Sequence, residues 1–252
     1  HKIQWTKRVC LEEQKMDVRL ISMDCTRTEF VGTAVLDTIG PVIPGADDSL
    51  LKQMDIGEKY RTLGLLSSRT GAAGQFTALD DAVKATNTEV LSIELPRDTK
   101  GWGGHGNYIV IGGNDVSDVR DAIQMALELT NKYAGELYLS EAGHLEFAYS
   151  ASAGEVLQKA FGAERDKAFG FLAGSPAAIG LVMADAAVKA SHVEIVNYMT
   201  PNTGTSHSNE VILAFSGDAS AVKAAVQEAR QIGLELLIAM GSYPMIPGEP
   251  YL

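Results

Sequence analysis

The sequence has 252 residues, of which 46% are hydrophobic and 21% are charged, so it can bury more than one core. Its net charge of −11 argues against nucleic acids and anionic membrane surfaces as partners, because binding to phosphate groups needs clustered Lys and Arg. No apolar run approaches the roughly 20 residues that span a bilayer, and the first residues lack the apolar region of a signal peptide. We therefore expect a globular cytosolic protein.

The first half of the chain predicts strands that alternate with helices. Apolar runs and period-two alternation indicate strands, whereas apolar residues spaced three and four positions apart indicate helices. In chain order we expect a strand over 28–34, a short helix over 49–55, a strand over 60–67 and a helix over 76–86. Two strands separated by a polar loop follow over 89–95 and 107–112, and then a helix over 116–127 that begins after an Asp115 N-cap.

The second half predicts the same elements in the same order. They are expected over residues 143–147, 154–161, 168–173, 178–191, 193–199, 210–215 and 218–232. An antiparallel sheet with helices on one side is the simplest arrangement for this order. The predicted fold class is therefore α+β, made twice.

The two halves are copies of one module. Residues 82–90 (AVKATNTEV) return 105 positions later as 187–195 (AVKASHVEI). A repeat of this length is the size of a small domain, which indicates duplication and fusion. The repeat extends to 108–111, which match 210–213, and a weaker echo pairs Glu29-Phe30 with Glu146-Phe147. The predicted organisation is an N-terminal extension over residues 1–27, a first domain over 28–134, a second domain over 135–242 and a C-terminal tail over 243–252.

Both modules carry a passage that resembles the bacterial microcompartment shell domain. In the first module it reads Asp80, then Ala82-Val83-Lys84-Ala85, then Glu89-Val90, followed by a loop, a strand, an acidic turn and an Ala/Val-rich helix. The opening strands precede this passage, which is similar to the circularly permuted form of the domain. Three further phrases resemble the tandem-domain B-type shell proteins of propanediol- and ethanol-utilising microcompartments: 37–40 (DTIG), 92–101 (SIELPRDTKG) and 112–119 (GGNDVSDV).

This resemblance, which covers 28–242, implies a structural protein rather than an enzyme, with no cofactor. Three chains with two domains each would form a trimeric, pseudohexagonal tile in the shell of a cytoplasmic microcompartment. The implied partners are other copies of the chain, other shell proteins, encapsulated enzymes, and small alcohols in the pores. By the same resemblance, Lys84 and Lys189 would lie at tile edges.

Two polar loops connect equivalent strands of the two modules, and in the family the first of them lines the pore. The candidate pore residues are Arg97, Asp98, Thr99, Lys100, Trp102 and His105 in the first loop, and Asn202, Thr203, Thr205, Ser206, His207 and Ser208 in the second. The first loop has charges and many glycines, so we expect it to be the mobile element. The second has no fixed charge and would supply fixed polar contacts. Whether alcohols pass centrally or through narrower channels within each subunit stays open.

Two alternatives compete with the shell protein. Residues 101–106 satisfy G-x-G-x-x-G, so an enzyme or sensor could bind a small molecule there with His105 in its pocket. The dinucleotide fingerprint must open a helix, however, and a strand is expected here. A regulatory oligomer that forms no sheets is the second alternative. The histidines show no paired metal-ligand spacing, so neither a metal nor a catalytic site is expected.

Overall fold

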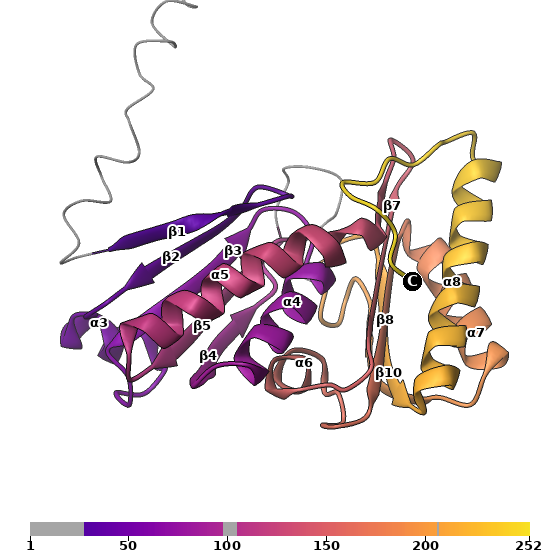
Figure 1. The fold of residues 1–252 in the computed structure, drawn as a ribbon. Coiled ribbons are helices and arrows are strands. Elements are labelled where there is room, and N and C mark those ends of the chain that lie inside the picture. Colours follow the sequence, from indigo (N-terminus) through magenta and orange to yellow (C-terminus); the bar gives the residue numbers. More distant parts are fainter. Residues whose placement is uncertain (1–27, 98–104, 206) are drawn as a thin grey trace, which may run out of the picture.

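The structure is a computed structural model in which residues 28–97, 105–205 and 207–252 are described (Figure 1). Within these residues the chain forms two five-stranded antiparallel sheets, with strand orders β1-β2-β3-β5-β4 and β6-β7-β8-β10-β9. The same order of elements builds both sheets. The predicted α+β fold with two copies of one module is therefore confirmed.

The elements of the first module match the predicted ones closely, with one strand added. They are β1 (Glu29–Ala34), β2 (Thr38–Ile43), α3 (Asp48–Met54), β3 (Thr62–Ser68), α4 (Ala73–Lys84), β4 (Thr88–Glu94), β5 (Asn107–Gly113) and α5 (Val116–Tyr133). A short 3-10 helix, η1 (Ala134–Glu136), leads into the second module. Its elements are β6 (Leu137–Leu139), β7 (His144–Ser150), α6 (Glu155–Phe161), β8 (Ala168–Ser175), α7 (Ala177–Ala190), β9 (Glu194–Met199), β10 (Val211–Gly217) and α8 (Ala219–Ala239).

Two strands, β2 and β6, are absent from the sequence prediction, so the first predicted strands of the two modules are matched incorrectly. The echo between Glu29-Phe30 and Glu146-Phe147 is wrong, because β1 is an edge strand whereas β7 is the second strand of its sheet. The counterpart of β7 is β2. Its Gly40-Pro41 pair hides the strand pattern. Gly40 is required there, since a Cβ at this position would lie 2.5 Å from Ile123 on α5.

The match of 108–111 with 210–213 is out of register by two residues. In the sheets, Gly64 lies opposite Ile111, and its counterpart Gly170 lies opposite Phe215. Residues 108–111 therefore correspond to 212–215 rather than to 210–213. A slip of two residues keeps every side chain on the same face of the strand, so alternation in the sequence cannot reveal it.

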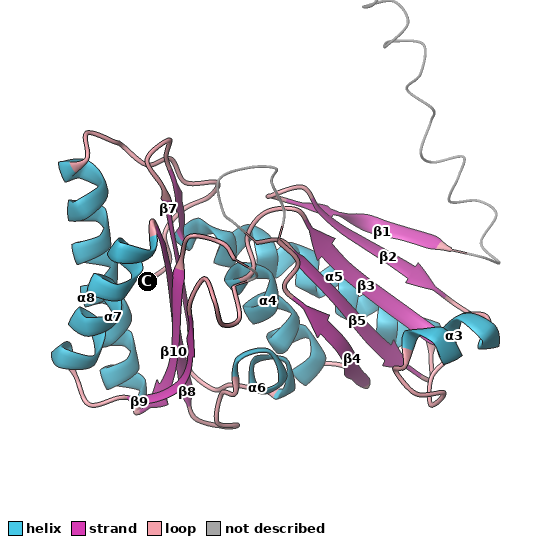
Figure 2. Cartoon of the chain, turned by 180° about the vertical axis from the view of Figure 1, so that it is seen from behind, coloured by secondary structure: helices cyan, strands magenta, loops and turns pink. Residues whose placement is uncertain are grey.

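Helices cover both faces of each sheet, which corrects the prediction of helices on one side. The long pairs α4–α5 and α7–α8 lie on one face, and the short helices α3 and α6 lie on the other (Figure 2). Leu51 of α3 packs with Leu63 and Val110 in one cluster of buried residues. The physical reason is that the central strands are apolar on both faces, so each face needs a cover.

The largest cluster of buried apolar residues extends through both modules. Helix α4 lies between the sheets, with α5 on one side and α6 and β7 of the second module on the other (Figures 1 and 2). The ring of Phe76 on α4 stands edge-on to that of Phe161 on α6, with centroids 5.2 Å apart. Both side chains are fully buried. Burial of this kind fixes the modules relative to each other.

The predicted tail over 243–252 is a docked strap. Met245 forms two backbone hydrogen bonds with Leu139, which adds it to the edge strand β6. The backbone N–H groups of Tyr251 and Leu252 donate to the Glu136 carboxylate, at 2.7 and 2.9 Å. The strap therefore returns to the link between the modules.

A candidate polar site at the junction of the two modules

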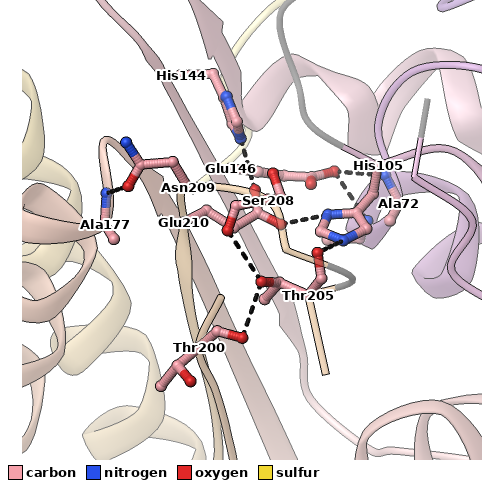
Figure 3. A network of polar contacts seen from close by, with 11 residues as sticks. Ala72, His105, His144, Glu146, Ala177, Thr200, Thr205, Ser208, Asn209 and Glu210 are labelled. Atoms are coloured by element: carbon pink, nitrogen blue, oxygen red, sulfur yellow. Dashed lines mark hydrogen bonds and ion pairs between the residues drawn. The ribbon is translucent and has the colours of Figure 1, made fainter. Parts of the chain in front are cut away.

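Four ionisable side chains gather where the second sheet meets the first module (Figure 3). His105 stands just before β5, His144 and Glu146 lie on β7, and Glu210 stands just before β10. All four residues are buried. Because an unpaired buried charge is costly, these groups have to satisfy one another.

Glu210 is the centre of the cluster. Its carboxylate forms ion pairs with Nδ1 of His105 and with Nε2 of His144, the latter at 2.9 Å. Burial by itself raises the pKa of Glu210, but hydrogen bonds from the two histidines outweigh it and lower the pKa to about 2. Glu210 is therefore an anion held between two imidazoles.

His105 is arranged as a cation. Its Nε2 lies 3.1 Å from the carbonyl oxygen of Thr205, while Nδ1 faces Glu210. Both partners only accept hydrogen bonds, so both ring nitrogens must carry a proton. Burial lowers the pKa of His105, but the bond to Glu210 and the attraction of its charge outweigh burial, so the pKa is raised.

Glu146 connects the cluster to the first module. Its Oε1 accepts the backbone N–H groups of Ala72 and Ala73 at the start of α4, at 2.9 and 2.8 Å. Helix α4 has no side-chain cap of its own, so a carboxylate from the second module satisfies its first amides. Burial raises the pKa of Glu146, and the two amide bonds offset this only in part.

A small cavity lies against this cluster. It is lined by the four ionisable residues together with Gly71, Ala72, Leu95, Phe161, Phe171, Ala173 and Ile212. It offers about 10 Å³ to the centre of a water molecule, which is roughly what one water needs. The junction therefore has room for one small hydroxyl-bearing group beside polar side chains.

The structure brings only some of the predicted pore residues to this site. His105 and Thr205 are members of the network, and the Thr205 hydroxyl donates to the carbonyls of Thr200 and Ser208, at 2.9 and 3.1 Å. Ser208 is buried beside them. Four other candidates are exposed, namely Arg97, Asn202, Thr203 and His207. Five lie outside the described residues, namely Asp98, Thr99, Lys100, Trp102 and Ser206.

The sequence prediction missed the rest of the network, which is His144, Glu146 and Glu210. These residues lie on strands or at strand ends and belong to no motif. Their partners in the network lie 66 to 105 positions away in the sequence, and those of Glu146 are in the first module. No local pattern could identify them. Only the pairing of the two modules brings them together.

The two lysines predicted for tile edges lie in different surroundings. The Lys84 ammonium donates to the carbonyl of Ser152 at 2.8 Å and pairs with Asp80 and Asp81, so it spans the junction inside one chain. Lys189 is exposed and pairs only with Asp185 of its own helix among the described residues, at 2.6 Å. A role of either lysine at a tile edge stays a prediction.

The G-x-G-x-x-G segment does not open a helix. Its last glycine, Gly106, leads into β5, and a Cβ there would lie 2.3 Å from the carbonyl oxygen of Ser68. This close approach explains the glycine without a nucleotide. Over the described ranges, no group of three His, Cys, Asp or Glu side chains is placed to hold a metal ion. The helices described here are also too short or too polar to cross a membrane.

We expect the free energy of unfolding to fall as the pH rises above 6.5, the ordinary pKa of histidine. The folded-state pKa of His105 is raised, so its contribution is complete below pH 6.5 and is lost as the pH rises through the folded-state value. The variant His105→Gln should flatten this decline in urea unfolding between pH 6 and 9. The exposed His192 provides the control, since His192→Gln should leave the decline intact. An unchanged decline in His105→Gln would assign it to another group.

The comparisons with known proteins agree with this architecture. The BMC domain matches two stretches, residues 62–142, which run from β3 into β6, and residues 168–247, which run from β8 into the C-terminal strap. The chain is 51% identical over 236 residues to the bacterial microcompartment shell protein PduB of Salmonella typhimurium, and the match covers 94% of this chain and 87% of that protein. The crystal structure of a trimeric bacterial microcompartment shell protein PduB superimposes with a TM-score of 0.85 at 46% identity, over 88% of this chain and 99% of that one.

A second solved structure, EtuB from Clostridium kluyveri, gives a TM-score of 0.86 at 46% identity, over 88% of this chain and 98% of that one. The relatives are shell proteins, which confirms the predicted structural role over an enzyme or sensor built on residues 101–106. The chain therefore belongs to the BMC domain family and is a tandem-domain shell protein of a bacterial microcompartment.

Proposed function

We propose that three copies of this chain form a pseudohexagonal tile of the shell. Each chain carries two modules of one fold side by side, so three chains supply six similar positions around an axis. The similar PduB structure, at 46% identity, is described as trimeric. Contacts of such tiles with other shell proteins belong to the same proposal, because the relatives are themselves shell proteins.

We further propose that small alcohols such as glycerol, 1,2-propanediol or ethanol pass through the polar junction within each chain. The observation that carries this proposal is the buried cluster of His105, Glu210 and their neighbours beside a cavity of the size of one water. A hydroxyl group that enters this cavity exchanges its hydrogen bonds with solvent for hydrogen bonds with these side chains at little net cost. All three alcohols are larger than one water, so the residues that line the cavity would have to move apart to let them pass.

Crystals soaked in glycerol or 1,2-propanediol test the route. We expect density for the alcohol within hydrogen-bond distance of Glu210, His105 or Thr205, because these groups offer a carboxylate, an imidazole and a carbonyl at one place. The variant Glu210→Gln keeps the shape but removes the charge, and it should weaken this density. Alcohol bound only far from both loops would refute the route and leave the shell role untouched.

A further inference from the structure

A second and larger cleft lies where helices of both modules meet the C-terminal strap. Its volume is about 450 Å³, which is in the range of pockets that hold small ligands. Three lysines and three tyrosines line it, namely Lys84, Lys132, Lys223, Tyr133, Tyr149 and Tyr251. We call it the lysine cleft. Among the described residues it shares no lining side chain with the small cavity beside Glu210.

We infer that the lysine cleft binds a phosphate monoester. Lys132 and Lys223 hold the phosphoryl group, and the organic part of the ester lies against the rings of Tyr133 and Tyr251. The site is formed within one chain. It therefore depends neither on the proposed tile nor on the proposed route for alcohols.

Lys84 has no donor left for a ligand. Its ammonium donates to the carbonyl of Ser152 at 2.8 Å and pairs with the carboxylates of Asp81 at 2.8 Å and Asp80 at 3.1 Å. An ammonium group has three N–H donors, so these partners occupy all of them. Lys84 and the two aspartates therefore neutralise one another and fix one wall of the cleft.

The acceptors at the strap also have partners of their own. Leu252 lines the cleft, and its carbonyl oxygen accepts hydrogen bonds from the guanidinium of Arg230, each at 3.3 Å. The carboxylate of Glu136 pairs with the same guanidinium at 3.1 Å. None of these groups is therefore the partner of Lys132 or Lys223.

Lys132 and Lys223 are the two cations of the cleft that lack a carboxylate. Lys132 ends α5 of the first module, and Lys223 lies in the second turn of α8 in the second module. Neither forms an ion pair with any other described residue. Two uncompensated cations on one concave surface concentrate positive potential there, although the chain as a whole has a net charge of −11. The cleft is therefore suited to an anion.

The number of cations favours a phosphoryl group over a carboxylate. A phosphate monoester carries a charge of about −1.5 to −2 near pH 7 and has three terminal oxygens, whereas a carboxylate carries only one charge. Lysine binds phosphate as a point charge on a flexible stem of four carbons. Since Lys132 and Lys223 line the same cleft, both ammonium groups can reach one phosphoryl group.

Two tyrosines form a wall for the organic part of the ester. The rings of Tyr133 and Tyr251 pack edge to face, with centroids 5.1 Å apart. The Tyr133 hydroxyl donates to Asp81 at 2.6 Å, and the Tyr251 hydroxyl accepts the backbone N–H of Tyr149 at 3.3 Å, so both rings are held without a ligand. The Lys132 ammonium lies 5.0 Å from the centroid of the Tyr133 ring. The cation and the apolar wall are therefore adjacent.

The second module does not repeat this chemistry. Helices α5 and α8 are counterparts, and the fully buried Val119 and Val222 mark an offset of 103 positions between them. At this offset Lys132 becomes Glu235 and Tyr133 becomes Leu236. The fold of the module thus requires neither the lysine nor the tyrosine. The cleft would be one site for each chain, at the junction only.

The first test is titration calorimetry with glycerol 3-phosphate at constant ionic strength. The unaltered chain should bind it, and Lys132→Gln and Lys223→Gln should each weaken binding about tenfold, because each removes a charged hydrogen-bond donor. Lys52→Gln is the matched control, since it removes the same charge from an exposed lysine on α3 and should bind like the unaltered chain. No binding, or an equal loss in Lys52→Gln, would overturn the inference.

The same titration with inorganic phosphate distinguishes an ester from the free ion. A free phosphate fills only part of a cleft of about 450 Å³ and makes no contact with the tyrosine wall, so it should bind more weakly than glycerol 3-phosphate. Tyr251→Ala should reduce this difference, because it removes one ring of the wall. Equal affinities for the two ligands in the unaltered chain would overturn the assignment to an ester.

Crystals soaked in glycerol 3-phosphate place the ligand. We expect density for its phosphoryl group within hydrogen-bond distance of Lys132 or Lys223. Glycerol itself, which has the same hydroxyl groups and no charge, should give no density in this cleft. Density for the ester only beside Glu210, or none at a concentration that saturates the chain in solution, would overturn the site. The proposed alcohol route would be untouched by that result, because it uses other residues.

Discussion

Replacing Phe161 with alanine should lower the free energy of unfolding by about 3–5 kcal/mol. Its ring is fully buried, with centroids 5.2 Å from Phe76 and 5.0 Å from Phe171. The substitution removes the apolar group on which α4 of the first module rests, and it leaves a cavity between two elements that are fixed by the rest of their modules. Urea unfolding followed by circular dichroism measures the loss.

Two further variants show whether the loss belongs to the junction. Phe161→Leu keeps most of the apolar volume and should cost less than half as much. Phe147→Ala, in the separate core under α7 and α8, should cost a similar amount. Only Phe161→Ala should speed hydrogen exchange at the Ala72 and Ala73 amides, which Glu146 holds across the junction. A loss below about 1 kcal/mol would show that the core is not continuous through both modules.

The sequence predicts the elements that bury a continuous apolar face. The helix over 178–191 and the strand over 168–173 differ from α7 and β8 by at most two residues. These segments have a clear period, and the 105-residue repeat supplies each of them twice. Local pattern is sufficient here because the burial of each element is decided within its own module.

The prediction fails where the chain departs from that period. The Gly40-Pro41 pair in β2 reads as a turn, although the glycine is there to let α5 approach the sheet. The short strand β6 has three residues and offers no periodicity at all. Omitting both strands matched the edge strand β1 of the first sheet with β7, the second strand of the other sheet.

The candidate site is less predictable than the fold because it is formed by the contact between modules. The place of His105 in a polar loop makes it a candidate from the sequence, whereas its partner Glu210 stands 105 residues later, just before another strand. Lys84 and Lys189 show the same limit. They occupy equivalent positions in sequence, yet only Lys84 has a second module against it. A sequence repeat predicts the same helices and strands in both modules, but it does not predict which part of the chain packs against each copy.

Glu136 is a second buried carboxylate whose role follows from the strap. It is fully buried in η1, accepts the amides of Tyr251 and Leu252, and pairs with Arg230 of α8 at 3.1 Å. The link between the modules, the last helix and the C-terminal strap thus meet at one group. Removing one partner of a buried ion pair leaves the other charge uncompensated.

The variant Glu136→Ala should therefore lower the free energy of unfolding by about 3–5 kcal/mol. Gly135→Ala separates the strap from the ion pair, because a Cβ at this position would lie 1.9 Å from the carbonyl oxygen of Glu249 and push the strap away. It should free residues 243–252 for proteolysis while Arg230 keeps its carboxylate, and so cost less than Glu136→Ala. Equal losses in the two variants would mean that Glu136 acts only by docking the strap. A larger loss in Glu136→Ala would show that the carboxylate also holds α8 to the link through Arg230.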